Sequence, residues 1–228
     1  MRTIALLCVF ASIAFAQPAS LIEATAAVNP NGSGASIVVR NHHSAPLSAF
    51  TFVYTLRTPD STVLSASNGF YDSLVDPANK PVPPGEEIRI PYYAGNRGMI
   101  PVVSIQAALF ADGMTYGNRN MIQVIFERRD YAAVTLNKLA GELKQAAKLG
   151  TTRQQLAVQM QTALNDERNA AGNTDLANLI LNLRNQVFMD LLNARNPTDG
   201  SQQSMDAFLP AEIESLTRRR EALLAAQK

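Results

Sequence analysis

The distribution of proline divides this chain into two parts that cannot share one architecture. Ten of the 12 prolines lie between Pro18 and Pro101, and none lies between Val102 and Asn196. Proline lacks an amide donor and its ring clashes with the preceding helical turn, so it is excluded from helix interiors. The proline-rich part is therefore predicted to contain strands and turns and the following part helices, with the boundary near Gly117.

Before this boundary, apolar and polar residues alternate as the two faces of a half-buried strand require. Phe50, Phe52 and Tyr54 fall on one face, while Thr51 and Thr55 fall on the other. Turn-forming residues separate this segment from further runs of the same kind. The additional strands are predicted at residues 21–28, 35–41, 62–66, 87–90 and 102–111.

Asp112 followed by Gly113 predicts a tight hairpin, because this pair tolerates the positive φ angles that such turns need. A two-residue turn there would place Leu109 opposite Tyr116. About seven short strands separated by turns are typical of an antiparallel β-sandwich, which we expect over residues 17–117.

Beyond the boundary, apolar residues recur every three or four positions, the period of an amphipathic helix. The stripe of the first predicted helix is interrupted by Arg129, and Asn120 with Gln123 resembles a capping box at its start.

Three more helices are predicted to start after Thr152, near Thr174 and just before Pro210, a residue that suits a first helical turn. About four helices over residues 118–228 are expected to form a bundle or hairpin region, packed on one another or on the sandwich.

The strand-rich part resembles the immunoglobulin-like and fibronectin-type-III-like sandwiches of exported bacterial proteins. The resemblance covers about residues 20–117 and rests on the strand spacing and on three turns, at residues 41–46, 83–85 and 112–113. The helical part resembles no family that its motifs identify. We therefore expect an α+β chain with an immunoglobulin-like sandwich followed by helices. The resemblance implies no functional residue, because such sandwiches share no active site.

Residues 1–16 have the organisation of a secretory signal peptide. Arg2 precedes a short apolar run, and Ala14 and Ala16 have the spacing that signal peptidase cleaves. A membrane span needs roughly 20 apolar residues, which is more than this run supplies. Cleavage after Ala16 is expected to yield a secreted or periplasmic chain without a transmembrane span. Cys8, the only cysteine, leaves with the signal, so no disulfide stabilises the exported chain.

The exported chain is electrically balanced, because loss of Arg2 leaves 19 basic side chains against 19 acidic ones. No overall field therefore favours a nucleic-acid partner. The basic run at residues 218–220 suits the end of a helix and is too short to indicate nucleic acid or a lipid surface.

Residues 92–98 form the segment that most resembles a recognition surface. Tyr93 supplies rigid contact area, and Asn96 and Arg97 supply directed hydrogen bonds. Our first hypothesis is an exported, non-catalytic binding or structural module that contacts a protein or glycan partner through these three residues.

A second hypothesis is an exported hydrolase in which Asp72 or Asp76 lies in a cleft against the helices. A third is self-assembly through the helices into a homo-oligomer. The sequence contains no dinucleotide or phosphate-loop motif. His42 and His43 are expected in an exposed turn, and on a strand they would point to opposite faces and make a poor chelating pair. We therefore expect no cofactor and no metal site.

Overall fold

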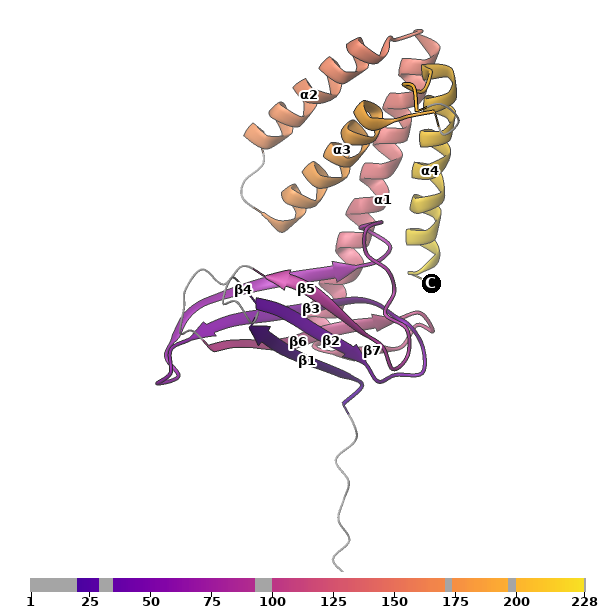
Figure 1. Cartoon of the computed structure of the whole chain (residues 1–228). Coiled ribbons are helices and arrows are strands. Elements are labelled where there is room, and N and C mark those ends of the chain that lie inside the picture. The colour runs from indigo at the N-terminus through magenta and orange to yellow at the C-terminus, as the bar shows by residue number, and fades with distance from the viewer. Residues whose placement is uncertain (1–19, 29–34, 93–99, 171–173, 197–199, 228) are drawn as a thin grey trace, which may run out of the picture.

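The computed structural model describes residues 20–28, 35–92, 100–170, 174–196 and 200–227. The chain is an α+β protein in which the strands precede the helices along the sequence (Figure 1), as predicted. The strands of the described part are β1 (Ile22–Val28), β2 (Ala35–Asn41), β3 (Leu47–Arg57), β4 (Val63–Asp72), β5 (Glu87–Tyr92), β6 (Ile100–Phe110) and β7 (Thr115–Gly117). The helices are α1 (Arg119–Lys148), α2 (Arg153–Ala170), α3 (Asp175–Asn193) and α4 (Met205–Ala225).

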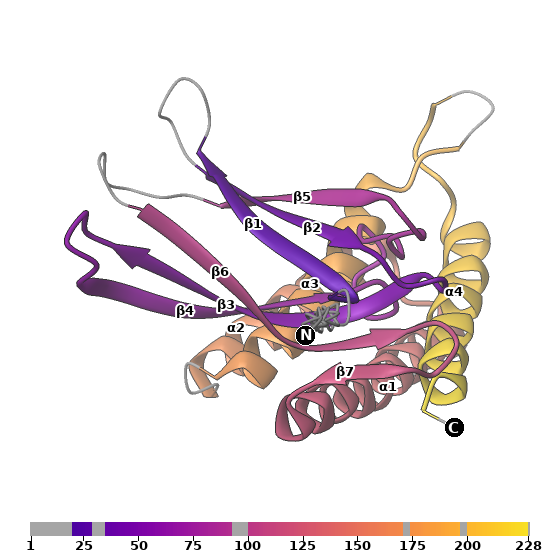
Figure 2. The same cartoon turned by 90° about the horizontal axis from the view of Figure 1, so that it is seen from below.

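The strands form two antiparallel sheets, ordered β1-β2-β5 and β4-β3-β6-β7 (Figure 2). Both sheets contribute to one apolar core, in which Ile37 and Val39 of β2 lie with Phe50 of β3 and Tyr71 of β4. The rings of Phe50 and Tyr71 stack with their centroids 4.9 Å apart. The alternation that predicted β3 therefore has its expected physical cause, since its large apolar side chains point between the sheets.

The hairpin between β6 and β7 differs from the predicted two-residue turn. Phe110 N donates to the carbonyl of Met114 at 2.9 Å, which leaves residues 111–113 as a three-residue loop. Gly113 ends this loop with a φ of +86°, the left-handed conformation that three-residue hairpins need at this position. Leu109 consequently pairs with Thr115 and not with Tyr116.

The junction of strands and helices lies at Gly117, as the proline distribution predicted. Gly117 has a φ of +93°, and an added Cβ would lie 2.3 Å from the carbonyl oxygen of Gln106, so only glycine fits there. The predicted capping box at Asn120 is wrong. The helix is capped by Asn118 instead, whose side chain accepts hydrogen bonds from the amides of Asn120 and Met121.

The four helices share a second apolar core, and two of their predicted starts are confirmed. Thr152 and Gln155 form a reciprocal capping box before α2, and Thr174 caps α3. The expected start of α4 is wrong, because Ser204 caps this helix and Pro210 lies inside it. Phe208 and Leu209 are buried in the bundle core, and this tertiary packing keeps the turn before Pro210 helical.

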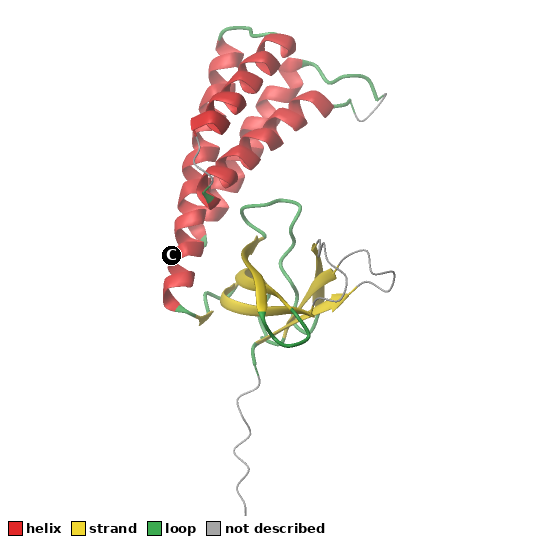
Figure 3. Ribbon diagram, turned by 90° about the vertical axis from the view of Figure 1, so that its left-hand side faces the viewer, coloured by secondary structure: helices red, strands yellow, loops and turns green. Residues whose placement is uncertain are grey.

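The helices dock directly on the sandwich (Figure 3). Ile125 of α1 packs against small apolar side chains on the outer face of β3 and β6. From the other side, Val75 in the loop after β4 lies in the core of the helices, and its carbonyl accepts a hydrogen bond of 3.1 Å from Arg219 of α4. The two parts are therefore joined by packing on the outer face of the sheet and by a loop that enters the helical core.

Arg184 of α3 holds three helices together. It is almost completely buried and contacts Glu142 of α1 at 2.6 Å and Glu167 of α2 at 2.9 Å. Burial alone would lower the pKa of Arg184, but the hydrogen bonds that Arg184 donates to the two carboxylates outweigh burial and raise that pKa.

We predict that Arg184→Met lowers the free energy of unfolding by about 3 kcal/mol. The substitution leaves Glu142 without its cation, and it leaves Glu167 with only the exposed Lys138 as a cationic partner among the described residues. Urea denaturation of the variant and the wild type measures the loss. The control is Arg218→Met, which removes an exposed arginine from α4 and should change stability by less than about 0.5 kcal/mol. Equal losses in the two variants would show that the buried cluster stabilises nothing.

A second prediction concerns how stability depends on pH through Glu212 of α4. Burial raises the pKa of Glu212, the charge of Asp190 raises it further, and Arg219 opposes both effects. A carboxyl group with a raised pKa binds its proton more tightly in the folded state, so its contribution to stability falls as pH rises through that pKa. Glu212→Gln should therefore stabilise the protein relative to the wild type near pH 7 more than near pH 4. Urea denaturation at both pH values checks this, with the exposed Glu214→Gln as control, and an equal effect at both values would contradict it.

Candidate functional site

A buried ion pair joins α1 to the sheet. Arg129, the residue that interrupts the apolar stripe of α1, is 2% exposed, and its Nε lies 2.8 Å from Oδ2 of Asp72 at the end of β4. Its Nη2 lies 3.2 Å from Oδ1 of Asp72 and 3.4 Å from Oγ of Ser48 on β3. Asp72 also accepts a hydrogen bond from the amide of Leu74, so both of its carboxylate oxygens are engaged.

A bulge in β3 positions the serine of this network. Leu47 pairs with Phe110 and Ala49 with Leu109, so Ser48 is an extra residue in the ladder with β6. The bulge lets Leu47 remain in the core between the sheets while Ala49 packs toward α1 on the outer face. The hydroxyl of Ser48 donates to the carbonyl of Leu109 at 3.0 Å and is thereby fixed toward the arginine of α1.

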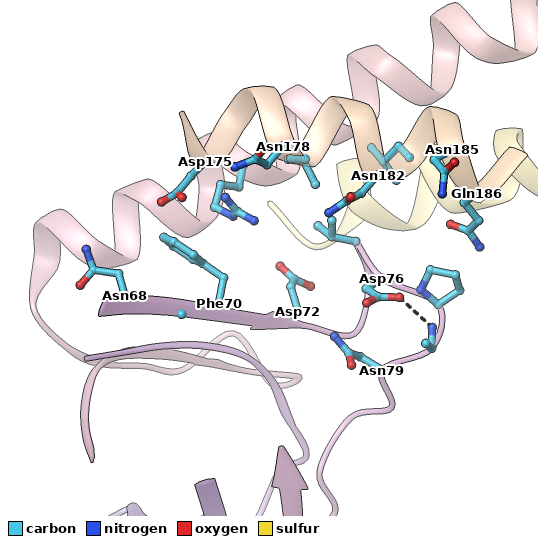
Figure 4. Close-up of a pocket in the computed structure, with 17 residues that line it drawn as sticks. Asn68, Phe70, Asp72, Asp76, Asn79, Asp175, Asn178, Asn182, Asn185 and Gln186 are labelled. Carbon is cyan, nitrogen blue, oxygen red and sulfur yellow. Dashed lines mark hydrogen bonds between the residues drawn. The ribbon is translucent and has the colours of Figure 1, made fainter. Parts of the chain in front are cut away.

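Beside this ion pair lies a groove of about 600 Å³ between the sheet and α3 (Figure 4). One wall consists of residues 68–70 and Asp72 of β4 with the loop that follows, and the other consists of α3. We call it the amide groove, because side-chain amides dominate its polar lining. They belong to Asn68, Asn79, Asn178, Asn182, Asn185 and Gln186.

Four of these amides lie on one face of α3. The spacings from Asn178 to Asn182, Asn185 and Gln186 are four, seven and eight residues, which a helix brings to one side. The side chains of Asn178, Asn182 and Asn185 form no hydrogen bonds within the part of the chain that the structure describes. The apolar residues of this helix recur every three or four positions and were predicted from the sequence. The amides beside them recur with the same period, but they were not predicted as a site.

Arg128 of α1 also lines the groove. Its guanidinium lies 4.0 Å above the ring centroid of Phe70, so this cation covers one face of the aromatic ring. Its Nη1 is buried without an acceptor among the described residues. Burial lowers the pKa of Arg128, and the charges of Asp175 and Asp72 oppose that shift.

Two further carboxylates lie at the groove. Asp175, the first residue of α3, and Asp76, in the loop after β4, are placed toward its two ends (Figure 4). Asp76 accepts a hydrogen bond of 3.0 Å from the amide of Ala78, which shapes the loop. The described residues contain no group of three or more histidine, cysteine, aspartate or glutamate side chains arranged to hold a metal ion.

The structure describes some of the residues proposed from the sequence and not others. Tyr93, Asn96 and Arg97 lie outside the described residues. Asp72 and Asp76, the carboxylates of the hydrolase hypothesis, both line the amide groove. His43 lies in the turn after β2, where it contacts Oδ2 of Asp112 at 2.9 Å, and it does not line the groove.

Comparison with known proteins finds no matching family model, no matching curated sequence and no matching solved structure. Within the residues described, no helix combines the length and apolar character needed to cross a membrane. The function of this chain is therefore inferred from the geometry of the site itself.

The ion pair beside the groove yields a stability prediction. Arg129→Met should lower the free energy of unfolding by about 3 to 5 kcal/mol, because Asp72 then lies buried without a cation. Adding Asp72→Asn should recover part of this loss, since the double variant buries no charge at this position. Denaturation of the two single variants and the double variant measures the coupling.

Arg119→Met is the matched control, because it removes an exposed arginine from the start of the same helix. If the losses at Arg129 and Asp72 add without coupling, the two side chains do not stabilise each other.

Proposed function

We propose that this protein is an exported, non-catalytic binding module and that the amide groove is its ligand site. The observation that carries the proposal is the row of amides on α3. Three of them, those of Asn178, Asn182 and Asn185, form no hydrogen bond within the described residues and face an opposing polar wall. An amide is both a donor and an acceptor, so such a row suits a ligand rich in hydrogen-bonding groups. A groove of about 600 Å³ is within the size range of ligand sites in proteins.

The position of the groove supports binding as well. Its walls come from two parts of the fold that the ion pair of Arg129 with Asp72 holds in fixed relation. Walls that are fixed before the ligand arrives reduce the entropy lost on binding. Apolar Leu179 and Leu183 beneath the amides anchor α3 in the helical core and keep the row in place.

Hydrolysis is the alternative, and the chemistry of the groove favours it less. Asp72 accepts hydrogen bonds from Arg129 and Leu74, which leaves neither carboxylate oxygen free for catalysis. Asp76 and Asp175 lie toward opposite ends of the groove, whereas a catalytic pair has to flank one scissile bond (Figure 4).

The proposal includes export through a signal peptide that is cleaved after Ala16. Its second part is that the sandwich is of the immunoglobulin-like type. The sheet order supports the second, because the chain changes sheet between β2 and β3 and again on each side of β5. Repeated crossing between two antiparallel sheets is how Greek-key sandwiches are connected. A contribution from Tyr93, Asn96 and Arg97 remains a separate prediction.

A labelled sample of the protein, applied to an array of oligosaccharides and peptides, tests the proposal. We expect the wild type to bind a subset of the array and Asn178→Ala/Asn182→Ala to lose that binding. The matched control is Gln161→Ala/Asn165→Ala, which removes two exposed amides from α2 and should bind like the wild type.

Mass spectrometry of the bound compounds then separates binding from hydrolysis. Unchanged ligand masses after prolonged incubation are expected of a binding module, and cleavage products would favour the hydrolase. Identical array patterns for the wild type and the α3 variant would contradict a ligand site in the amide groove.

A further inference from the structure

The amide groove meets β4 on the outer face of its sheet. Asn68, Phe70 and Asp72 alternate along the strand and point toward α3 (Figure 4). Gly69 between them faces the other way, because an added Cβ would collide with the ring of Phe52 in the core between the sheets. A ligand in the groove therefore contacts side chains of β4 and does not pair with the backbone edge of this strand.

Amides without partners line both walls of the groove. On α3, the side chains of Asn178, Asn182 and Asn185 form no hydrogen bond within the described residues. The same holds for the side chains of Asn68 on β4 and Asn79 in the loop that follows. Each amide offers two donor hydrogens and one acceptor oxygen. A ligand between the walls is therefore met by donors and acceptors from opposite sides, along about 10 Å of α3.

The charges at one end of the groove compensate each other. Asp72 is engaged by the buried arginine of α1 described above, so its charge is neutralised. Asp175 lies toward the end of the groove at the start of α3 (Figure 4). Its charge acts on Arg128, which lines the same groove and offsets it.

At the other end, Arg219 of α4 offsets the charge of Asp76. Arg219 donates to the carbonyl of Val75 at 3.1 Å and to the side-chain oxygen of Gln186 at 3.4 Å. Two more carboxylates act on Arg219, but they line a separate pocket between α3 and α4: Asp190 and Glu212. Neither sign of charge is therefore in excess in the groove. A charged ligand would lose hydration there without gaining a counter-ion, so the lining favours an uncharged one.

The lining does not suit the common modes of peptide recognition. Strand addition needs a free sheet edge, and an amphipathic helix needs an apolar groove. The apolar residues beneath the amides, Leu179 and Leu183, are buried in the helical core. Proline-rich segments dock on exposed aromatic faces, and one face of Phe70 is covered by the guanidinium of Arg128. Acidic motifs need arginines whose charge is not already offset.

A sugar chain has the complementary chemistry. Its rings carry uncharged hydroxyl groups around their periphery, and each hydroxyl both donates and accepts, so both walls can contact the same ring. The amide of one asparagine can pair with two neighbouring hydroxyls by donating to one and accepting from the other. A volume of about 600 Å³ accommodates a short segment of such a chain.

We propose that the amide groove binds a short segment of an uncharged oligosaccharide through hydrogen bonds from the asparagines of both walls. This inference rests on the proposed function, because it identifies the class of ligand that the same groove would take. A hydrogen bond that replaces one to water adds little net affinity, and Arg128 covers one face of the aromatic ring, so we expect weak binding. NMR titration is suited to weak complexes and also reports on individual side-chain amides.

The probes are tetrasaccharides added to the isotope-labelled protein. Cellotetraose, maltotetraose and the chitin tetramer are neutral, whereas the chitosan tetramer is cationic and the galacturonate tetramer is anionic. The chitosan tetramer has the same backbone as the chitin tetramer, with an amine in place of each acetamide. At least one neutral probe should shift the side-chain amide resonances of Asn178, Asn182 and Asn185. We expect it to bind at least about tenfold more tightly than both charged probes.

The variants used against the array provide the second comparison. Asn178→Ala/Asn182→Ala should weaken binding of the neutral probe about tenfold or more, while Gln161→Ala/Asn165→Ala should leave it unchanged. Circular dichroism of each variant verifies that the helices are intact. This is expected because both pairs of substitutions place alanine at exposed helical positions.

The inference would be overturned if no neutral probe shifted these resonances, or if a charged probe bound as tightly as the best neutral one. Equal effects of the two double variants would overturn it as well. An uncharged peptide, SNTNTNTNS, separates this inference from the proposed function. If the peptide bound in a manner sensitive to Asn178→Ala/Asn182→Ala while no sugar did, the groove would still be a ligand site, and only the oligosaccharide inference would fail.

Discussion

The guanidinium of Arg129 is a positive charge buried away from water. The docking of the helices on the sheet depends on the groups that neutralise this charge. The guanidinium is engaged by Asp72 at the end of β4 and by Ser48 on the bulge of β3. A buried charge without such partners would cost several kcal/mol, so α1 is stable in this position only when it lies against these two strands. Ile125, one helical turn earlier, adds apolar contacts on the same face of the sheet.

The amide groove is a consequence of this junction. Fixing α1 on the outer face of the sheet places α3, which packs against α1, opposite the end of β4. The loop after β4 then reaches the helices and inserts Val75 into their core. The space that remains between β4 and α3 is lined by polar side chains, because each element directs its apolar residues into a core of its own. A binding site between two parts of the fold arises in this way without any specialised loop.

Sequence periodicity predicted the elements better than it predicted their contacts. The bounds of β2 and the cap of α3 at Thr174 match the structure because local patterns determine them. The bulge at Ser48 has no signal in the sequence, and it decides which side of β3 faces α1. Pro210 was misread because packing of Phe208 sustains helix where local preference alone would start it. Arg129 was visible as a break in an apolar stripe, but its partner Asp72 lies 57 positions earlier in the chain, beyond the reach of any local pattern.

The amide groove has fixed walls only if the sheets and the helices form one rigid body. Nitrogen NMR relaxation of the backbone amides tests this most directly, because it reports how fast each part tumbles. We predict the same rotational correlation time for strands β2 and β3 as for helices α1 and α3. Two different correlation times would mean that the parts move independently, and the amide groove would then have no fixed walls and could not serve as the binding site.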